Sequence, residues 1–255
     1  MRRAMFVVLT LAALTPGCLV VEAPSDHEMP IQPDDFCTRL AQVECEGFDH
    51  CCDDPTVRAH APTHDECVQM AQHQCTNGSF NISVAVHDGR TGYDPYYGGA
   101  VIETMRDYVS RCDPEIVRFT NRRDGLESAL RGTVANGAAC LDGMDITMNF
   151  GVLLSCEDFS SACILRDGTH GECAMRRSVN DSCFLDFDCR EGLYCTGLIG
   201  GHCQMRLPIG GDCQAPLSTT QQHTWCESSY CVMGHCAAPT RTNVYCGSST
   251  IPTMM

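Results

Sequence analysis

Cysteine is the residue type whose number and spacing point most directly to chemistry in this chain. The sequence holds 21 cysteines among 255 residues, a density typical of extracytoplasmic proteins that are stabilised by disulfides. No two cysteines have the C-x-x-C spacing, which counts against thioredoxin-like exchange and against a zinc ribbon. The neighbours Cys51 and Cys52 could form a redox switch, but two partners in different directions would staple neighbouring helices instead. Because Cys18 is expected to be either lipidated or removed during processing, the cysteines expected to form disulfides are Cys37, Cys45, Cys51, Cys52, Cys67, Cys75, Cys112, Cys140, Cys156, Cys163, Cys173, Cys183, Cys189, Cys195, Cys203, Cys213, Cys226, Cys231, Cys236 and Cys246.

Two groups of side chains could bind a metal ion. The first consists of His60, His64, His73, Asp65 and Glu66. A proline lies between the first two histidines and breaks the helical i, i+4 geometry that a metal pair needs, so we interpret the group as structural or solvated. The second group could hold calcium through oxygen ligands and consists of Asp142, Asp145, Asp186 and Asp188. No EF-hand spacing accompanies these aspartates, and we expect them to be solvated carboxylates.

Catalytic motifs are missing from the sequence. It contains no H-E-x-x-H, no G-x-S-x-G, no G-x-x-x-x-G-K-[ST] and no G-x-G-x-x-G. Arginine supplies all 17 basic residues, and the lack of lysine rules out a lysine nucleophile, a Schiff base and a P-loop lysine. We therefore assign no catalytic residue, no cofactor and no metal. Trp225, the sole tryptophan, is expected to pack in a thin core, with a ligand contact as the alternative.

The net charge makes some partners unfavourable. With 32 acidic residues the formal net charge is −15, and such a surface repels the phosphates of nucleic acid and anionic lipid headgroups. Nucleic acid is therefore not an expected partner, and contact with a membrane is expected only through a lipid anchor.

Residues 1–17 have the pattern of a signal peptide. MRRAMFVVLTLAALTPGC contains two early arginines, then an apolar run too short to span a bilayer, and ends in small residues. It resembles a bacterial lipoprotein signal in which Cys18 becomes the lipidated first residue, which implies a protein of the cell envelope. Leu19 follows the cysteine, and analogy with enteric sorting then favours the outer membrane. A cut after Ala23 would instead give a secreted protein. Residues 18–34 are acidic and contain prolines, and we interpret them as a tether.

Residues 35–132 show mainly helical patterns. Four helices are expected from apolar side chains at helical spacing: one capped by Asp34 or Asp35, one after the capping box Thr63–Glu66, one through Ile102, Met105 and Val109, and one through Leu126, Ala129 and Leu130. Between the second and third helices, apolar residues alternate over 80–86 before Asp88-Gly89, which predicts a strand and a turn. This region is therefore expected to be a small helical domain with one hairpin.

From residue 133 onward the pattern changes to three four-cysteine repeats. They cover residues 133–175, 176–205 and 206–240, and residues 241–255 form a tail that contains Cys246. The middle repeat has the spacing C-x5-C-x5-C-x7-C, whereas the first interval lengthens to 15 residues in the first repeat and to 12 in the third. These two intervals predict variable loops, where recognition commonly takes place. We expect little regular structure in the repeats beyond short β-hairpins.

The three repeats resemble the Dickkopf-type N-terminal cysteine-rich module, which recurs in tandem in lipoproteins of myxobacteria and related bacteria. FCTRLAQVEC, the cysteine pair at 51 and 52, GRTGYD and DYVSRC are similar to the helical domain that often precedes those modules. The expected fold is a small, mainly α-helical, disulfide-stapled domain followed by three small disulfide-rich modules. Four cysteines allow three connectivities, and analogy with other small cysteine modules favours first-to-third and second-to-fourth pairing.

The cysteine count predicts a link between the two regions. The helical region holds seven cysteines, an odd number, and has none between Ala100 and Thr104, where the similar bacterial proteins commonly have one. If the twelve cysteines of the repeats pair within their own repeat, one helical cysteine is left over. Cys246 is therefore expected to pair with a cysteine of residues 35–112.

These features favour a non-catalytic protein of the cell surface, or a secreted one, that presents disulfide-framed modules to an extracellular protein or glycan. A protease inhibitor is one alternative, because cysteine-framed loops hold a rigid segment. Another alternative is an extracytoplasmic hydrolase whose site lies in residues 35–132.

Overall fold

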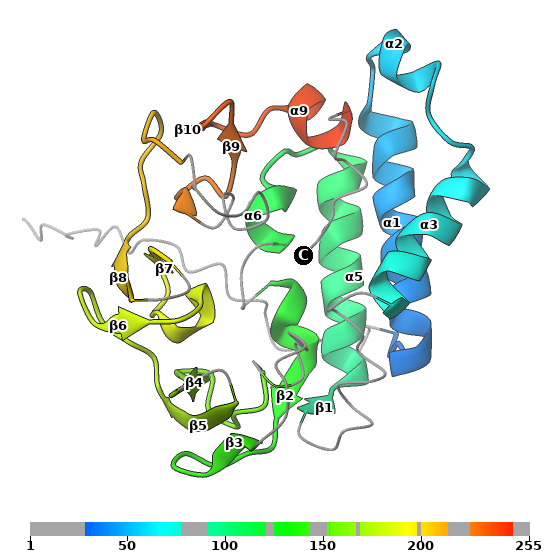
Figure 1. Ribbon diagram of the computed structural model, residues 1–255. Helices are drawn as coiled ribbons and strands as arrows, with labels where there is room; N and C mark the ends of the chain where they lie inside the picture. The colour runs from blue at the N-terminus through cyan, green and yellow to red at the C-terminus, as the bar shows by residue number, and fades with distance from the viewer. Residues whose placement is uncertain are drawn as a thin grey trace, which may run out of the picture.

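The computed structural model describes residues 29–77, 91–120, 125–142, 152, 154–166, 169–197, 200–213 and 225–246. In these residues helices pack together on one side of the molecule, and small antiparallel sheets lie on the other (Figure 1). Ten disulfides cross-link the chain, so the expected combination of a disulfide-rich fold with helices and short strands is confirmed. None of the described helices is long and apolar enough to cross a membrane. The expected leader, most of the tether, and the strand and turn at 80–89 lie outside the described residues.

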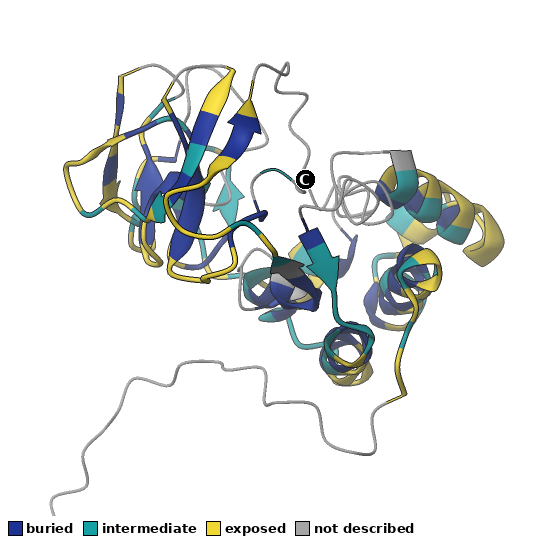
Figure 2. Ribbon diagram, turned by 90° about the horizontal axis from the view of Figure 1, so that it is seen from below, coloured by how far each residue is buried: buried dark blue, intermediate teal, exposed yellow. Residues whose placement is uncertain are grey.

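Three helices form the body of the helical domain: α1 (Pro33–Cys51), α3 (His64–Asn77) and α5 (Pro95–Ser110). α1 packs against both of the others, and Figure 2 shows that helices of this part have one buried side and one exposed side. The largest fully buried side chains of the molecule come mostly from α1 and α5: Phe36, Val43, Val101, Ile102 and Met105. Each contributes on the order of 2 kcal/mol by leaving water, so the main apolar core lies here. Two short helices, α2 (Pro55–Arg58) and α6 (Ile116–Thr120), follow α1 and α5 respectively.

Disulfides fix the arrangement of these helices. Two bonds join α1 to α3, Cys37–Cys75 and Cys45–Cys67, and a third joins the end of α1 to the residues after α5, Cys51–Cys112. The vicinal cysteines 51 and 52 have partners in different parts of the chain, because Cys52 pairs with Cys246.

The helix starts agree with the sequence prediction in one case and not in another. The Thr63 N–H donates to Glu66 Oε2 at 2.8 Å, and the Glu66 N–H donates to Thr63 Oγ1 at 3.4 Å, which confirms the capping box before α3. The prediction that Asp34 or Asp35 caps α1 is wrong. The helix already begins at Pro33, a residue favoured in the first turn, and the two aspartates lie inside that turn, where the helix dipole stabilises negative charge.

The prediction of a fourth helix through Leu126 and Leu130 is also wrong. Leu126–Ala129 forms only a 3-10 turn, η1, and the chain continues as strand β2 (Leu130–Gly132), which pairs antiparallel with β1 (Thr91–Tyr93). Ala129 and Leu130 are buried in the helical core. Their apolar spacing therefore reflects burial beside the helices, and the pairing with β1 decides the backbone conformation.

Three small antiparallel sheets lie beyond β2, with the strand orders β3-β5-β4, β6-β8-β7 and β10-β9. The elements are β3 (Ala139–Asp142), β4 (Ser161–Leu165), β5 (His170–Met175), β6 (Ser182–Cys183), the 3-10 turn η2 (Asp186–Asp188), β7 (Leu193–Cys195), β8 (Gly201–Met205), β9 (Cys231–Val232) and β10 (His235–Cys236). One sheet falls in each of the stretches 133–175, 176–205 and 206–240, which we call the three cysteine segments. In every segment the first cysteine is bonded to the third and the second to the fourth, the pairing that analogy favoured: Cys140–Cys163, Cys156–Cys173, Cys183–Cys195, Cys189–Cys203, Cys213–Cys231 and Cys226–Cys236.

The cysteine segments also share one pattern of backbone contacts. The residue six positions before the first cysteine forms a parallel bridge with the second cysteine in each case: Val134, Arg177 and Leu207. The residue three positions before the first cysteine donates its N–H to the carbonyl of the fourth cysteine, at 2.8, 2.8 and 2.7 Å: Gly137, Asn180 and Gly210. These three residues have positive φ, a conformation that glycine adopts freely and asparagine tolerates, which explains their types.

The last described residues return to the helical domain. Helix α9 (Arg241–Cys246) packs against α1, and the Cys52–Cys246 bond confirms the predicted link from Cys246 to the helical region. The Tyr245 ring is part of the helical core, and its hydroxyl donates to the Asp113 carbonyl at 3.0 Å. The helical domain and the cysteine segments therefore form one closed body, in which the chain leaves at β2 and comes back at α9 (Figure 1).

Candidate binding surface

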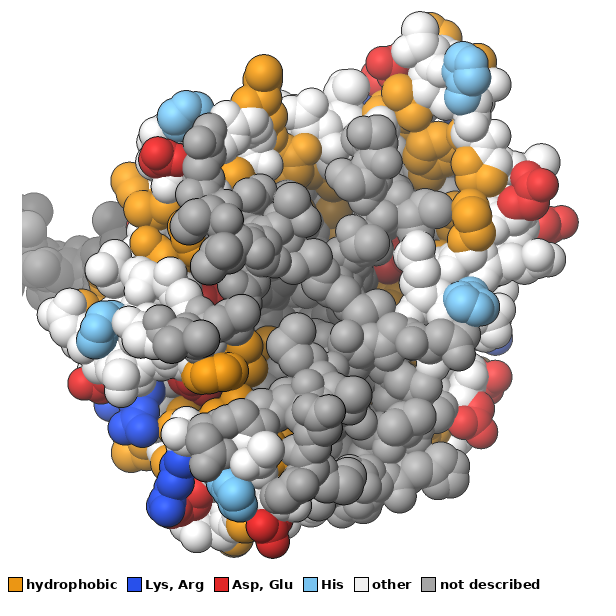
Figure 3. All heavy atoms as spheres, viewed as in Figure 1, with side chains coloured by type: hydrophobic (Ala, Val, Ile, Leu, Met, Phe, Trp, Pro, Cys, Tyr) orange, Lys and Arg blue, Asp and Glu red, His pale blue; other side chains and the backbone are white. Residues whose placement is uncertain are grey.

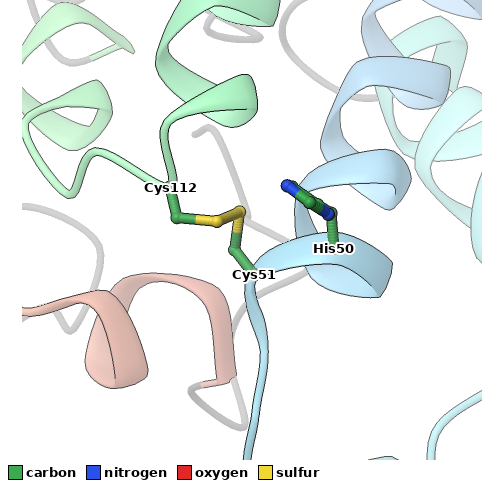
Figure 4. Close-up of side chains that lie close together, drawn as sticks. All are labelled: His50, Cys51 and Cys112. Carbon is green, nitrogen blue, oxygen red and sulfur yellow. A yellow bond between two sulfur atoms is a disulfide. The ribbon is translucent and has the colours of Figure 1, made fainter.

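The cysteine clusters of the described residues are disulfides. Figure 4 shows His50 close to Cys51 and Cys112, whose sulfur atoms are bonded to each other. Two further clusters of three cysteines, one in the second cysteine segment and one in the third, consist likewise of disulfide-bonded residues. Zinc and soft metals need a deprotonated thiolate, so oxidation withdraws all three clusters from metal binding.

Three of the histidine-group residues line a shallow groove of about 720 Å³ beside α3, together with Met70: His60, Glu66 and His73. The Glu66 carboxylate accepts hydrogen bonds from the backbone and the hydroxyl of Thr63, at 2.8 and 2.9 Å, and these bonds lower its pKa. His60 Nδ1 lies 2.9 Å from the Thr56 carbonyl. The carboxylate of the groove is therefore committed to the start of a helix, which supports a structural role for this group.

The other two members of that group lie elsewhere. His64 Nδ1 is 2.7 Å from Asp49 Oδ2, and both side chains are exposed. Asp65 is exposed in the first turn of α3, where a negative charge is favoured. The histidine group is thus divided between the groove, a side-chain contact that joins α3 to α1, and an exposed position in the first turn of α3.

The aspartates of the second cysteine segment bind backbone groups. Asp188 is 1% exposed, and its Oδ2 accepts the N–H groups of Phe184 and Leu185 at 2.6 and 3.0 Å. Burial raises the pKa of Asp188, and the two hydrogen bonds oppose that rise. Asp186 Oδ1 accepts the Cys195 N–H at 2.6 Å. The prediction that these two carboxylates are simply solvated is therefore wrong, since both hold the turn η2 in place.

Asp142 agrees with the expectation of a solvated carboxylate. It is exposed at the end of β3, and its Oδ1 lies 3.9 Å from His170 Nε2. Asp145 lies outside the described residues.

Trp225 packs against another cysteine segment. Its ring lies 5.0 Å from that of Tyr194, with an angle of 33° between the planes. The Trp225 side chain is half-buried, and the backbone carbonyl of Trp225 accepts the Leu207 N–H at 2.7 Å. The tryptophan therefore fixes the third cysteine segment to the second, as a packing residue would.

Sequence patterns did not point to the extended segment 175–179, which joins the first two cysteine segments. Exposure alternates along it: Met175, Arg177 and Val179 are exposed, whereas the two residues between them are partly buried. Met175 is 62% exposed and Val179 45% exposed. The next connection repeats the arrangement, with Met205 62% exposed and Ile209 67% exposed. The available signal was the repeated sequence C-x-M-R, in CAMR and CQMR.

Two contacts extend this exposed row across the second cysteine segment. The Arg190 N–H donates to the Arg177 carbonyl at 2.9 Å, which places the backbones of the two arginines next to each other. The Asn180 N–H donates to the Cys203 carbonyl at 2.8 Å, which brings the turn at Val179 to the strand that ends in Met205. We call Met175, Arg177, Val179, Arg190 and Met205 the junction surface. Arginine and hydrophobic side chains lie next to each other around the connection from β5 to β6 (Figure 3).

The junction surface contains two exposed arginines among carboxylates that bind backbone groups. Asp181, like Asp186 and Asp188, accepts a backbone N–H, that of Ser178 at 2.7 Å, so these three carboxylates are occupied within their own segment. Arg177 and Arg190 are exposed and form no ion pair with any residue of the described parts of the chain. Two exposed arginines thus stand beside carboxylates that each accept at least one backbone N–H.

Comparison of the chain with family models, with curated proteins and with solved structures finds no match in any of the three.

Proposed function

We propose that this is a non-catalytic extracytoplasmic binding protein, in which a helical domain carries three copies of one disulfide-framed module and the modules contact a protein ligand. The observation that carries the proposal is the recurrence of exposed apolar side chains at equivalent positions of the two connections, Met175 with Val179 and Met205 with Ile209. Large exposed apolar side chains that recur on a rigid frame are typical of an interaction surface.

The backbone geometry supports three copies of one module. The shared disulfide pairing, the parallel bridge at the same offset and the positive-φ turn at the same offset all recur, although the loops differ in length. A Dickkopf-type module, with its cysteine-based frame, is the family type that we propose for these segments.

Location in the cell envelope is part of the proposal. Lipidation at Cys18 would attach the described body to a membrane through the tether, residues 18–34. Incorporation of an acyl label in vivo, and its loss in Cys18→Ser, would support the anchor. A mature N-terminus at Pro24 would show secretion instead.

Chemical cross-linking in the native envelope tests the binding function. The oxidised mature protein should give a saturable cross-link to a defined protein, and reduced, alkylated protein should not, because the modules need their disulfides to hold the surface. Absence of any saturable partner, together with substrate turnover that His64→Ala or Asp65→Ala abolishes, would refute the proposal in favour of a hydrolase in residues 35–132. Stoichiometric inhibition of a purified protease would favour the inhibitor alternative.

A further inference from the structure

The second cysteine segment separates its charges by role. Its aspartates Asp181, Asp186 and Asp188 accept backbone N–H groups, whereas Arg177 and Arg190 are exposed. Exposed Glu191 follows Arg190 in the chain and forms no ion pair with either arginine. Arg190 Nε donates to a backbone carbonyl at 3.3 Å, which leaves the two terminal nitrogens of that guanidinium for a ligand. Both guanidiniums therefore remain available to a carboxylate from outside, which arginine can bind through two parallel hydrogen bonds.

Apolar side chains flank these charges. Met175 and Val179 are the neighbours of Arg177 on the exposed side of the same extended segment, and Met205 lies across the turn from Val179. Methionine is unbranched and adapts its shape to a partner, so a methionine at each end of the row suits a surface that accepts varied apolar side chains. A ligand that matches this row needs acidic groups with apolar side chains beside them.

We propose that the junction surface binds a protein partner through a segment that is acidic and apolar. The proposal rests on the proposed binding function and specifies the chemistry of the partner. Charge complementarity decides between possible occupants. A basic segment would be repelled by the two guanidiniums, and a glycan would leave the methionines and Val179 without apolar partners.

The charge distribution of the whole molecule sharpens this choice. α1 carries the acidic residues Asp34, Asp35, Glu46 and Asp49 but a single arginine, Arg39. Acidic side chains are visible along the helical side of the molecule and also beside the arginines near β5 and β6 (Figure 3). The arginines of the junction surface are therefore the groups that can attract an acidic segment, whereas the acidic side of α1 repels it.

Selection from a random peptide library tests directly which chemistry the junction surface binds. A displayed library of random 12-residue peptides is selected on the oxidised wild-type protein, and the selected peptides are measured against two variants of equal charge change. The first, Arg177→Glu with Arg190→Glu, reverses the junction surface. The second, Arg39→Glu with Arg106→Glu, reverses exposed arginines on α1 and α5. Intact mass and thermal unfolding establish that both variants are oxidised and folded.

The expected peptides are enriched in Asp and Glu next to Leu, Ile, Val or Phe. Their affinity should fall at least about tenfold for the junction variant and less than about twofold for the control, and it should weaken with salt. Met175→Ser with Val179→Ser, which keeps both arginines, should also weaken binding.

Several results would overturn the inference. Peptides that bind the junction variant as well as the wild type would show a protein-binding site elsewhere, and the general binding function would survive. Failure to select any peptide, or binding only to phosphatidylglycerol vesicles or to dextran sulfate, would reject an acidic protein segment as the partner. A dimer of the wild type that the junction variant abolishes would assign the surface to a second copy of this chain.

Discussion

At the scale of single residues, Glu44 is the ionisable side chain whose burial has the largest consequence. It lies on α1 among residues that face the core, and burial raises its pKa from 4.5 to about 8. The carboxyl group is therefore protonated in the folded protein at pH 7, whereas it is ionised in the unfolded chain. As pH rises from 4.5 toward 8, the unfolded chain releases the Glu44 proton and the folded protein keeps it. The free energy of unfolding therefore falls across this interval.

Replacement of Glu44 by glutamine should remove this pH dependence. We expect Glu44→Gln to match the wild type near pH 4 and to be more stable at pH 8 by on the order of 2 kcal/mol, a value reduced from full linkage because the side chain is only partly enclosed. Thermal unfolding between about pH 4 and pH 9 measures the difference. Glu46→Gln, at an exposed position of the same helix, is the control. Parallel stability curves for Glu44→Gln and the wild type would contradict the prediction.

A second prediction at this scale concerns Trp225. Because its ring packs on Tyr194, Trp225→Ala should loosen the third cysteine segment from the second and lower stability by about 2–4 kcal/mol. Hydrogen exchange should increase at β7, which contains Tyr194, and at the Leu207 N–H, which donates to the Trp225 carbonyl. Trp225→Phe, which keeps an aromatic ring, should lose less. Unchanged exchange combined with a loss of ligand binding would instead identify Trp225 as a ligand contact.

The role of a residue could be predicted from the sequence where a local contact determines it, but not where contacts between distant parts of the chain determine it. The capping box of Thr63 and Glu66 is a contact within four residues, so the sequence alone predicts it. The bonds from Asp186 and Asp188 to the backbone depend on the shape of η2, which the disulfides of that segment fix. The exposure of Met175 and Val179 depends on how two segments meet, and apolar residues are otherwise expected inside.

At the scale of elements, Gly47 allows α9 to lie against the bundle. A Cβ atom at this position would come within 3.1 Å of Val109 Cγ2 and 3.2 Å of Tyr245 Cε1. Such distances are shorter than normal contacts between side chains, so a larger residue must push one neighbour away. α9 has six residues, whereas α5 has sixteen, eight of them buried, so we expect α9 to move in preference to α5.

Gly47→Val should therefore separate α9 from α1 and destabilise the fold by about 1–3 kcal/mol. Hydrogen exchange of residues 241–246 should rise, while exchange in the core of α5 changes less. Glu46→Val places the same β-branched residue at an exposed site of α1 and controls for helix propensity. Equal exchange at α9 in both variants would show that Gly47 is not needed for this packing.

The elements also show which patterns can be read from sequence. The spacing of Ile102, Met105 and Val109 predicts α5 correctly, because these side chains form one buried face. The same kind of spacing at Leu126, Ala129 and Leu130 is misleading, since these residues lie in a turn and a strand. The pairing of β1 with β2 joins residues about forty positions apart, and no local signal specifies it.

At the scale of the whole molecule, closure of the chain is the feature that cysteine counting predicts. An odd number of helical cysteines required a partner from outside, and Cys246 supplies it through Cys52. The count gave neither the choice of Cys52 nor the burial of Tyr245, because both depend on how α9 meets α1. Closure converts a row of small modules into one body whose surfaces have fixed relative positions.

Removal of this bond tests whether closure depends on it. In Cys52→Ser with Cys246→Ser, the other nine disulfides should still form, and the stability should fall by up to about 5 kcal/mol in the chain-entropy model, because the bond closes the longest loop in the protein. Some docking should remain, since Tyr245 still packs in the core and Arg241 Nε still donates to the Cys51 carbonyl at 2.8 Å. Small-angle scattering should therefore show a larger mean radius of gyration and a broader distribution of this radius, and raised temperature should increase both.

The control is Cys45→Ser with Cys67→Ser, which removes a bond inside the helical domain and should lower stability without the expansion. Scattering curves for Cys52→Ser with Cys246→Ser that superimpose on the wild type up to its unfolding temperature would show that packing of α9 alone closes the molecule.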